Sequence, residues 1–185
     1  MSSRYKARED QLPHFVTSTL VGWVDALSRE QYKQIICDSL AYCQKEKGLQ
    51  LHAWVIMSNH FHLIISASQG AQISGLMRDI KKFTSRKIVE SIINNLQESR
   101  KEWMLNIFRL AGQNSESNDE YQFWQRDYHP IALDTQHKML QRLNYLHENP
   151  VRAGIVWQPE HYKYSSATDY FTNQPGLLRL LKLEC

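Results

Sequence analysis

The pattern of apolar and polar positions predicts two adjacent strands near the middle of the chain. Residues 51–57 are apolar and rich in β-branched and aromatic side chains, a Ser-Asn turn follows, and residues 60–67 are again typical of a strand. Side chains alternate between the faces of a strand, so His60 and His62 project from one face about 7 Å apart. The pattern therefore predicts a β-hairpin that presents two neighbouring imidazoles.

The segments that flank this hairpin predict an alternation of strands and helices. We expect a strand over residues 14–24, a helix over about 29–47 between an N-cap at Ser28 and a stop at Gly48, and a helix over about 73–93 after the hairpin. On this second helix, Leu76, Ile80 and Phe83 recur at helical spacing and should face the sheet.

The next segment predicts an insertion and then a last strand. Residues 97–111 favour an amphipathic helix with Trp103, Ile107 and Leu110 on its apolar side, and residues 112–120 are a polar loop. We treat about 97–120 as one insertion and expect the fourth strand over 121–129. The β-α-β-β-α-β order predicts an α+β fold: a ferredoxin-like, split β-α-β antiparallel sheet with helices on one face.

A further helix is expected near the C-terminal end. Asp134 or Thr135 would cap it, Pro150 would end it, and its apolar side comprises Met139, Leu140, Leu143 and Leu146. Tyr145 and Asn149 lie four residues apart and are therefore neighbours on one face of this helix. The remaining residues, from about 157 to 185, form a C-terminal tail.

Composition limits the possible classes of protein. The chain has 185 residues, of which 42% are hydrophobic, and this length suits one domain over residues 1–185. Its net charge of +3 neither requires nor excludes a nucleic-acid partner, and its 3 cysteines show no paired spacing. Without a signal-like segment or an apolar run long enough to span a bilayer, we expect a cytoplasmic protein with no membrane partner.

The candidate chemistry combines the two imidazoles with the tyrosine. Two imidazoles and an amide oxygen leave open positions on a hard cation, which suits Mg²⁺ or Mn²⁺. Such a cation would polarise a phosphate that Tyr145 attacks in line, giving a covalent phosphotyrosine. On these residues alone, two ordinary sheet histidines and a half-buried packing tyrosine remain open alternatives.

Three motifs carry a resemblance to a known family. His60-Phe61-His62 after a hydrophobic strand resembles the His-hydrophobic-His (HUH) motif of single-tyrosine transposases, and residues 53–59, 145–154 and 162–170 resemble the REP-associated tyrosine transposase branch. The resemblance covers roughly residues 14–170. It implies a ferredoxin-like fold and one divalent metal ion. It also implies nicking and rejoining of single-stranded DNA beside hairpin-forming, palindromic repeats through a 5′-phosphotyrosine.

Carried over by motif, the resemblance assigns roles to individual residues. It makes His60 and His62 the metal ligands and Tyr145 the nucleophile, with the tyrosine on the C-terminal helix. Asn149 stands where relatives place a third polar ligand, which is often Gln in the sister insertion-sequence transposases. Many members dimerise, so a homodimer is possible, with the tyrosine helix serving its own subunit or the neighbouring one.

Contacts to DNA are expected from basic side chains on the second long helix. Arg78, Lys82 and Arg86 follow one another at four-residue spacing, with Lys81 and Lys87 beside them, and Arg152 follows the tyrosine. Such a stripe would follow a phosphate backbone, although a solvated helix face has the same pattern. Residues that could stack on unpaired bases, or belong to the core or its rim, are Trp124, Tyr128 and His129.

Two other functions remain open from the sequence. One is a domesticated, catalytically silent protein that binds DNA in a regulatory role. The other is a metal-dependent phosphoesterase, in which the histidines activate water and the tyrosine is structural.

Overall fold

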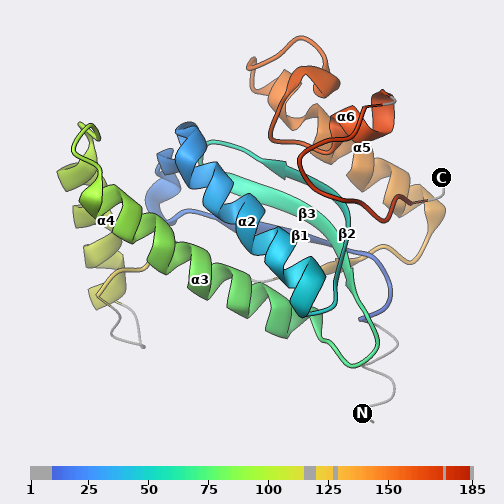
Figure 1. The fold of residues 1–185 in the computed structure, drawn as a ribbon, viewed down its shortest axis with the longest axis horizontal. Coiled ribbons are helices and arrows are strands. Elements are labelled where there is room, and N and C mark those ends of the chain that lie inside the picture. The colour runs from blue at the N-terminus through green and yellow to red at the C-terminus, as the bar shows by residue number, and fades with distance from the viewer. Residues whose placement is uncertain (1–9, 115–119, 127–128, 173, 184–185) are drawn as a thin grey trace.

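A central sheet of four antiparallel strands organises the protein (Figure 1). The computed structural model describes residues 10–114, 120–126, 129–172 and 174–183. The strands are β1 (His14–Thr19), β2 (Leu49–Ile56), β3 (His60–Ala67) and β4 (Ile131–Ala132). The long helices are α2 (Glu30–Glu46), α3 (Ile73–Asn94), α4 (Lys101–Gln113) and α5 (Gln136–Arg152), and the short ones are η1 (Val21–Trp23), η2 (Ala26–Ser28), η3 (Pro159–His161) and α6 (Ala167–Phe171).

The strand order β2-β3-β1-β4 is that of a ferredoxin-like sheet, which confirms the expected α+β fold. Strand β3 lies between β2 and β1 and pairs antiparallel with both, so the predicted hairpin is confirmed. Across the sheet, Thr17 of β1 lies opposite His62, and Thr19 lies opposite His60. The two histidines therefore sit on an inner strand, where both neighbours fix their backbone.

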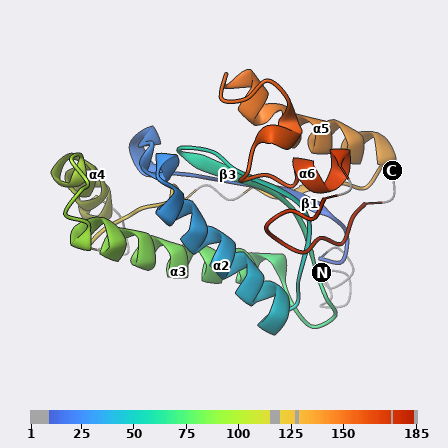
Figure 2. The ribbon, with the colours of Figure 1, turned by 45° about the horizontal axis from the view of Figure 1, so that its top comes forward.

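Helices cover both faces of the sheet (Figure 2). Helices α2 and α3 lie on one face, and α5 with α6 lies on the other, so the C-terminal helix is separate from the two helices of the ferredoxin-like unit. Within the part of the chain that the structure describes, no helix is both long and apolar enough to cross a membrane.

The inner stripe of α3 differs from the prediction at one position. Leu76 and Ile80 are buried as expected, but Phe83 is 43% exposed. Thr84 takes the inner position instead, and its hydroxyl accepts a hydrogen bond of 3.0 Å from the Trp124 indole. The buried stripe drifts with the 3.6-residue period of the helix, and this drift turns Phe83 outward.

Helix α4 begins later than predicted, at Lys101, and its buried side is different. The Glu98 carboxylate is buried and forms ion pairs with Arg29 and Arg100, and these contacts fix a turn before the helix. The side chains that α4 buries include Met104, Leu105 and Phe108, whereas the predicted Trp103 and Leu110 are 52% and 50% exposed.

The prediction of a fourth strand over 121–129 was wrong. Residues 121–126 pair with the chain after β1 only through an isolated bridge between Leu20 and Trp124, and residues 127 and 128 lie outside the described part. The chain after β1 leaves strand geometry at η1, where Gly22 has a φ of 62°. Residues 121–126 therefore have no longer extended segment after β1 with which to pair. The fourth strand is instead β4, which pairs with His14 and Phe15.

Helix α5 begins as predicted and ends later. The Thr135 side chain accepts a hydrogen bond of 3.3 Å from the Lys138 amide and caps the helix. The helix continues through Pro150, which is buried, and the amide of Ala153 still bonds to the Asn149 carbonyl at 3.0 Å. The tyrosine-bearing helix therefore extends to Arg152.

The segment after η3 fastens α5 to the edge strand β2. The backbone amide of Ser166 donates to the Trp54 carbonyl at 2.9 Å, and the Ile56 amide donates to the Tyr164 carbonyl at 2.9 Å. The Ser166 hydroxyl lies 2.9 Å from the Trp54 amide and 2.8 Å from Nε2 of His147 on α5. One buried hydroxyl thus connects the sheet to the helix.

Replacement of this hydroxyl should weaken the fold. In Ser166→Ala the buried Trp54 amide and the His147 nitrogen lose a partner, and we expect a loss of about 1–3 kcal/mol in the free energy of unfolding, measured by urea denaturation. Ser91→Ala on α3, where the side chain is half-buried, should change it by less than about 0.5 kcal/mol. Equal effects of the two substitutions would contradict the bridging role of Ser166.

Candidate functional site

The two histidines of β3 meet the tyrosine of α5 within one chain. The ring centroids of His60 and His62 are 4.8 Å apart, and the centroid of Tyr145 is 5.4 Å from that of His62. The predicted convergence of the imidazole pair and the phenol is therefore present in the geometry. It arises because alternation places both imidazoles on the sheet face that α5 covers.

The protonated nitrogen of His60 is set by its neighbour Asn59. Asn59 Nδ2 donates to the Trp23 carbonyl at 3.4 Å, so its Oδ1 is the atom that faces His60 Nδ1 at 2.6 Å. An amide oxygen only accepts hydrogen bonds, which means that Nδ1 carries the proton. The Nε2 of His60 then keeps its lone pair.

His62 is held on two sides by β1. Its Nδ1 lies 2.7 Å from the Thr17 hydroxyl, and its ring stacks on Phe15 with a centroid distance of 5.0 Å. Its Nε2 is buried and has no hydrogen-bond partner within the described residues. A buried nitrogen without a partner is costly unless something binds it, so this atom marks a binding position.

Both imidazoles are neutral near pH 7. Burial, followed by repulsion from His60 and from Arg142, lowers the pKa of His62 to about 3. Burial also lowers the pKa of His60, and the hydrogen bond that its protonated ring would make with Asn149 partly offsets this effect. Neutral imidazoles are the form that binds metal ions.

The face of α5 that covers the histidines carries four polar side chains at helical spacing. Asn149 donates through Nδ2 to the Tyr145 carbonyl at 2.8 Å, which leaves its Oδ1 to face His60. The Arg152 guanidinium lies 5.6 Å from the Tyr145 ring centroid, and that of Arg142 lies 5.1 Å from the Phe15 centroid. Two cations thus stand beside the phenol and the imidazoles.

Three residues of this site were not predicted. Arg142 lies three residues before Tyr145, so the helical spacing that selected Asn149 also selects it. Thr17 and Phe15 carry no signal of their own in the sequence, because only the pairing of β1 with β3 brings them to His62.

A divalent cation fits this set of donors. The described residues contain no group of three or more His, Cys, Asp or Glu side chains that could hold a metal ion. The donors that converge here are two neutral imidazoles and one amide oxygen, and the unpartnered Nε2 of His62 is among them. These are the three side chains that were predicted from the sequence as ligands, and their role as ligands stays a prediction.

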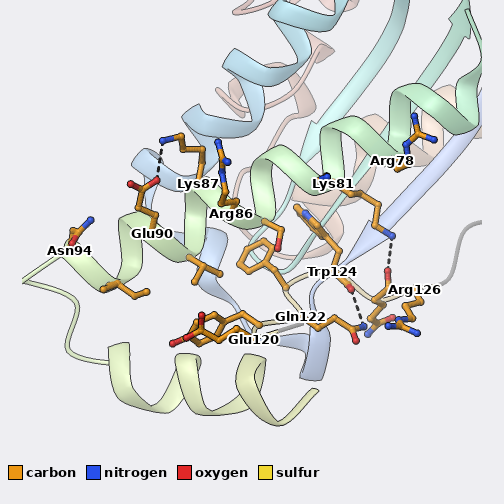
Figure 3. A pocket seen from close by; sticks show the side chains of 17 residues that line it. Arg78, Lys81, Arg86, Lys87, Glu90, Asn94, Glu120, Gln122, Trp124 and Arg126 are labelled. Atoms are coloured by element: carbon orange, nitrogen blue, oxygen red, sulfur yellow. Dashed lines mark hydrogen bonds and ion pairs between the residues drawn. The ribbon is translucent and has the colours of Figure 1, made fainter. Parts of the chain in front are cut away.

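A basic groove lies on the other face of the sheet, between α3 and residues 121–126 (Figure 3). It has a volume of about 1260 Å³, and the predicted DNA contacts Arg78, Lys81, Lys82 and Arg86 all line it. Lys81 donates to the Gln125 carbonyl at 2.6 Å. The fifth predicted contact, Arg152, is not in this groove but beside Tyr145.

The predicted stacking residues do not form a platform in this groove. Trp124 is 4% exposed, and its indole donates to Thr84, so its ring belongs to the core. Tyr128 lies outside the described residues, and His129 is exposed. Of the aromatic residues that line the groove, Phe123 and Trp124 are buried and Tyr121 is half-buried, so the predicted residues give it charges for phosphates but no stacking platform.

The burial of His62 predicts a pH dependence of stability. Its pKa is about 3 in the folded state and about 6.5 in the unfolded chain, so protons bind preferentially to the unfolded chain. Its contribution to stability is complete above about pH 6.5 and is lost as the pH falls towards 3. In His62→Gln the slope of the unfolding free energy against pH over this range should fall by up to about 1.4 kcal/mol per pH unit.

Urea denaturation at a series of pH values measures this slope, with His161→Gln as the exposed control. His52 and His147 are also buried, with lowered pKa values. They contribute to the same slope of unfolding free energy against pH and are unchanged in both variants. An unchanged slope in His62→Gln would contradict a neutral, buried imidazole at this position.

Comparisons with known proteins agree with this fold and its motifs. Residues 23–106 match the family model described as transposase IS200-like. The solved structure of a REP-associated tyrosine transposase bound to a REP hairpin is 19% identical, with 90% of this chain and 84% of that chain covered at a TM-score of 0.62. A candidate transposase from Deinococcus radiodurans R1 is 17% identical, with 72% of this chain and 87% of that chain covered at a TM-score of 0.44.

Comparison with curated proteins found no match. The resemblance drawn from the sequence is thus supported in two ways: residues 23–106 carry IS200-like transposase sequence, and the chain shares the fold of the REP-associated tyrosine transposase.

Proposed function

We propose that this protein nicks and rejoins single-stranded DNA at hairpin-forming repeats through a 5′-phosphotyrosine on Tyr145. The observation that carries the proposal is the meeting of His60, His62 and Tyr145 on one sheet face. The relative of known structure that shares the fold is bound to a REP hairpin, which supports this class of substrate.

In this proposal, His60, His62 and Asn149 hold Mg²⁺ or Mn²⁺ through two imidazole Nε2 atoms and an amide oxygen. The bound cation would supply Lewis-acid polarisation of the scissile phosphate. Asn59 and Thr17 orient the imidazoles by occupying their Nδ1 atoms, as the outer partners of metal-bound histidines do.

The phenol oxygen of Tyr145 forms a bond to phosphorus, and the bond from phosphorus to the 3′ oxygen breaks. Tyr145 loses its proton, and the departing 3′ oxygen takes one up to become a free hydroxyl. Arg152, over the phenol ring, would offset charge on the phosphate. Rejoining is the reverse attack by a 3′ hydroxyl on the phosphotyrosine.

The site would act within its own subunit, because its imidazoles, phenol and amide all come from one chain. A homodimer, which the resemblance also implies, is then not needed to complete the site. Arg78, Lys82 and Arg86 of the basic groove would hold the phosphate backbone of the same DNA, together with Lys81.

Two alternatives from the sequence keep the fold and change the chemistry. A catalytically silent protein would bind hairpin DNA through the basic groove and leave it intact. A metal-dependent phosphoesterase would use His60 and His62 to activate water. The contact of the Tyr145 ring with His62 supports the transposase over the phosphoesterase, in which the tyrosine has no part in the chemistry.

Substitution of the nucleophile separates these three functions. With Mn²⁺ and a labelled single-stranded hairpin, the wild type should give a protein–DNA adduct that survives denaturation, and Tyr145→Phe should give none because it lacks the attacking oxygen. Tyr42→Phe, exposed on α2, should keep the adduct. Gel electrophoresis under denaturing conditions measures both.

The other outcomes identify the alternatives. Cleavage without an adduct that persists in Tyr145→Phe would support the phosphoesterase. Binding without cleavage, unaffected by Tyr145→Phe or His60→Ala, would support the silent DNA-binding protein.

The basic groove predicts a dependence of binding on salt. Lys82→Gln with Arg86→Gln should weaken binding of hairpin DNA and reduce the slope of log affinity against log salt by about 2, since each cation releases about one counterion. Lys45→Gln with Arg179→Gln, outside this groove, is the matched control. Titration by fluorescence anisotropy at several salt concentrations measures the slope. An equal reduction in the control pair would exclude the groove as the phosphate-binding surface.

A further inference from the structure

Trp23 has an exposed indole on a strained backbone. Its φ of 56° lies in the left-handed region, and it is the one residue other than glycine with a positive φ among those the structure describes. Its side chain is 64% exposed and lies outside the apolar core formed by the described residues. A bulky residue in this conformation is a costly choice for packing alone, which suggests another use.

The insertion holds the turn that carries Trp23. A Cβ atom placed on Gly22 would lie 3.1 Å from the Ile107 side chain of α4, so the turn packs directly on this helix. The Val21 amide donates to the Phe123 carbonyl at 3.0 Å, and Arg100 forms an ion pair of 2.6 Å with Asp25. Figure 1 shows this segment, after β1, beside α4. Contacts with α4, and with residues before and after that helix, therefore hold the turn in place.

A single side chain separates this turn from the histidine pair. The Trp23 carbonyl accepts a hydrogen bond from Asn59 Nδ2 at 3.4 Å, and the Oδ1 of the same amide accepts from His60 at 2.6 Å. The backbone of Asn59 also bonds to Leu20 at 2.9 Å. The backbone of Trp23 is therefore tied to the position of His60, and its side chain is exposed.

We propose that Trp23 is a stacking platform for an unpaired base of the single strand next to the scissile phosphate, and that the α4 insertion serves to hold this platform. The inference rests on the proposed function, because it needs single-stranded DNA at the histidine pair. An indole stacks on the π-face of every base, so Trp23 would bind the strand without selecting its sequence. The basic groove would provide charges for the phosphates, and Trp23 would provide an indole that is 64% exposed for a base.

Binding of a fluorescent base tests this placement. Single-stranded hairpin DNA carries 2-aminopurine at successive positions around the cleavage site, and the protein carries Tyr145→Phe so that no adduct forms. At one or two of these positions, binding should quench the fluorescence, and Trp23→Leu should remove the quenching and weaken binding about tenfold or more. Trp103→Leu, which replaces an indole 52% exposed on α4, is the matched control and should change neither.

The urea midpoint of unfolding distinguishes a role of Trp23 in DNA binding from a purely structural role. Trp23→Asn places a residue that tolerates the left-handed region and should not lower the urea midpoint of unfolding, yet it should weaken DNA binding as Trp23→Leu does. If Trp23 only supports the turn, its replacement lowers the midpoint and leaves the quenching positions intact, and this result would overturn the inference.

The outcomes also separate this inference from the proposed function. Adduct formation by the wild type with full affinity and quenching in Trp23→Leu would overturn the platform and leave the chemistry in place. Quenching that depends on Trp23 without any adduct would overturn the chemistry and leave the platform. A wild type that does not bind single-stranded DNA would overturn both.

Discussion

Two imidazoles held neutral on one face of β3 are the feature on which the rest of the site depends. Strand alternation puts His60 and His62 on the same side, and their outer partners, Asn59 and Thr17, occupy the Nδ1 atoms. Burial keeps both rings unprotonated, although it leaves the Nε2 of His62 without a partner. Both rings are thus held in the neutral form that can bind a metal ion.

The packing of α5 across the same face completes this site. The helix is fastened to the edge strand through Ser166, and its continuation through Pro150 keeps Arg152 in line with Tyr145. The face of the helix that covers the imidazoles carries the phenol of Tyr145, the amide of Asn149 and two guanidinium groups. In the proposed function, the sheet would supply the metal ligands and the helix would supply the nucleophile.

In the proposed function, one face of the sheet would bind DNA phosphates and the other would carry out the chemistry. Helix α3 and residues 121–126 present cations in a groove whose aromatic side chain Trp124 is buried in the core. The α5 face would present the groups proposed to react.

The hairpin, the helix periods and the tyrosine helix could be predicted from the sequence because each is a local pattern. The fourth strand could not, since residues 121–126 have strand-like composition but the turn at Gly22 removes the edge they would need. Phe83 and Trp103 were placed inside because a period read over a few residues does not fix the phase of a long helix. Thr17 and Phe15 at the site depend on pairing between distant strands, which leaves no local signal.

Electron paramagnetic resonance of the protein loaded with Mn²⁺ tests the central claim most directly. Pulsed spectra should show two directly bound imidazole nitrogens in the wild type, one in His62→Gln, and two in Tyr145→Phe, because the proposal makes the phenol the nucleophile and not a ligand. Mn²⁺ that binds with no imidazole nitrogen, or with the same nitrogen signal in His62→Gln, would contradict a metal site at the histidine pair.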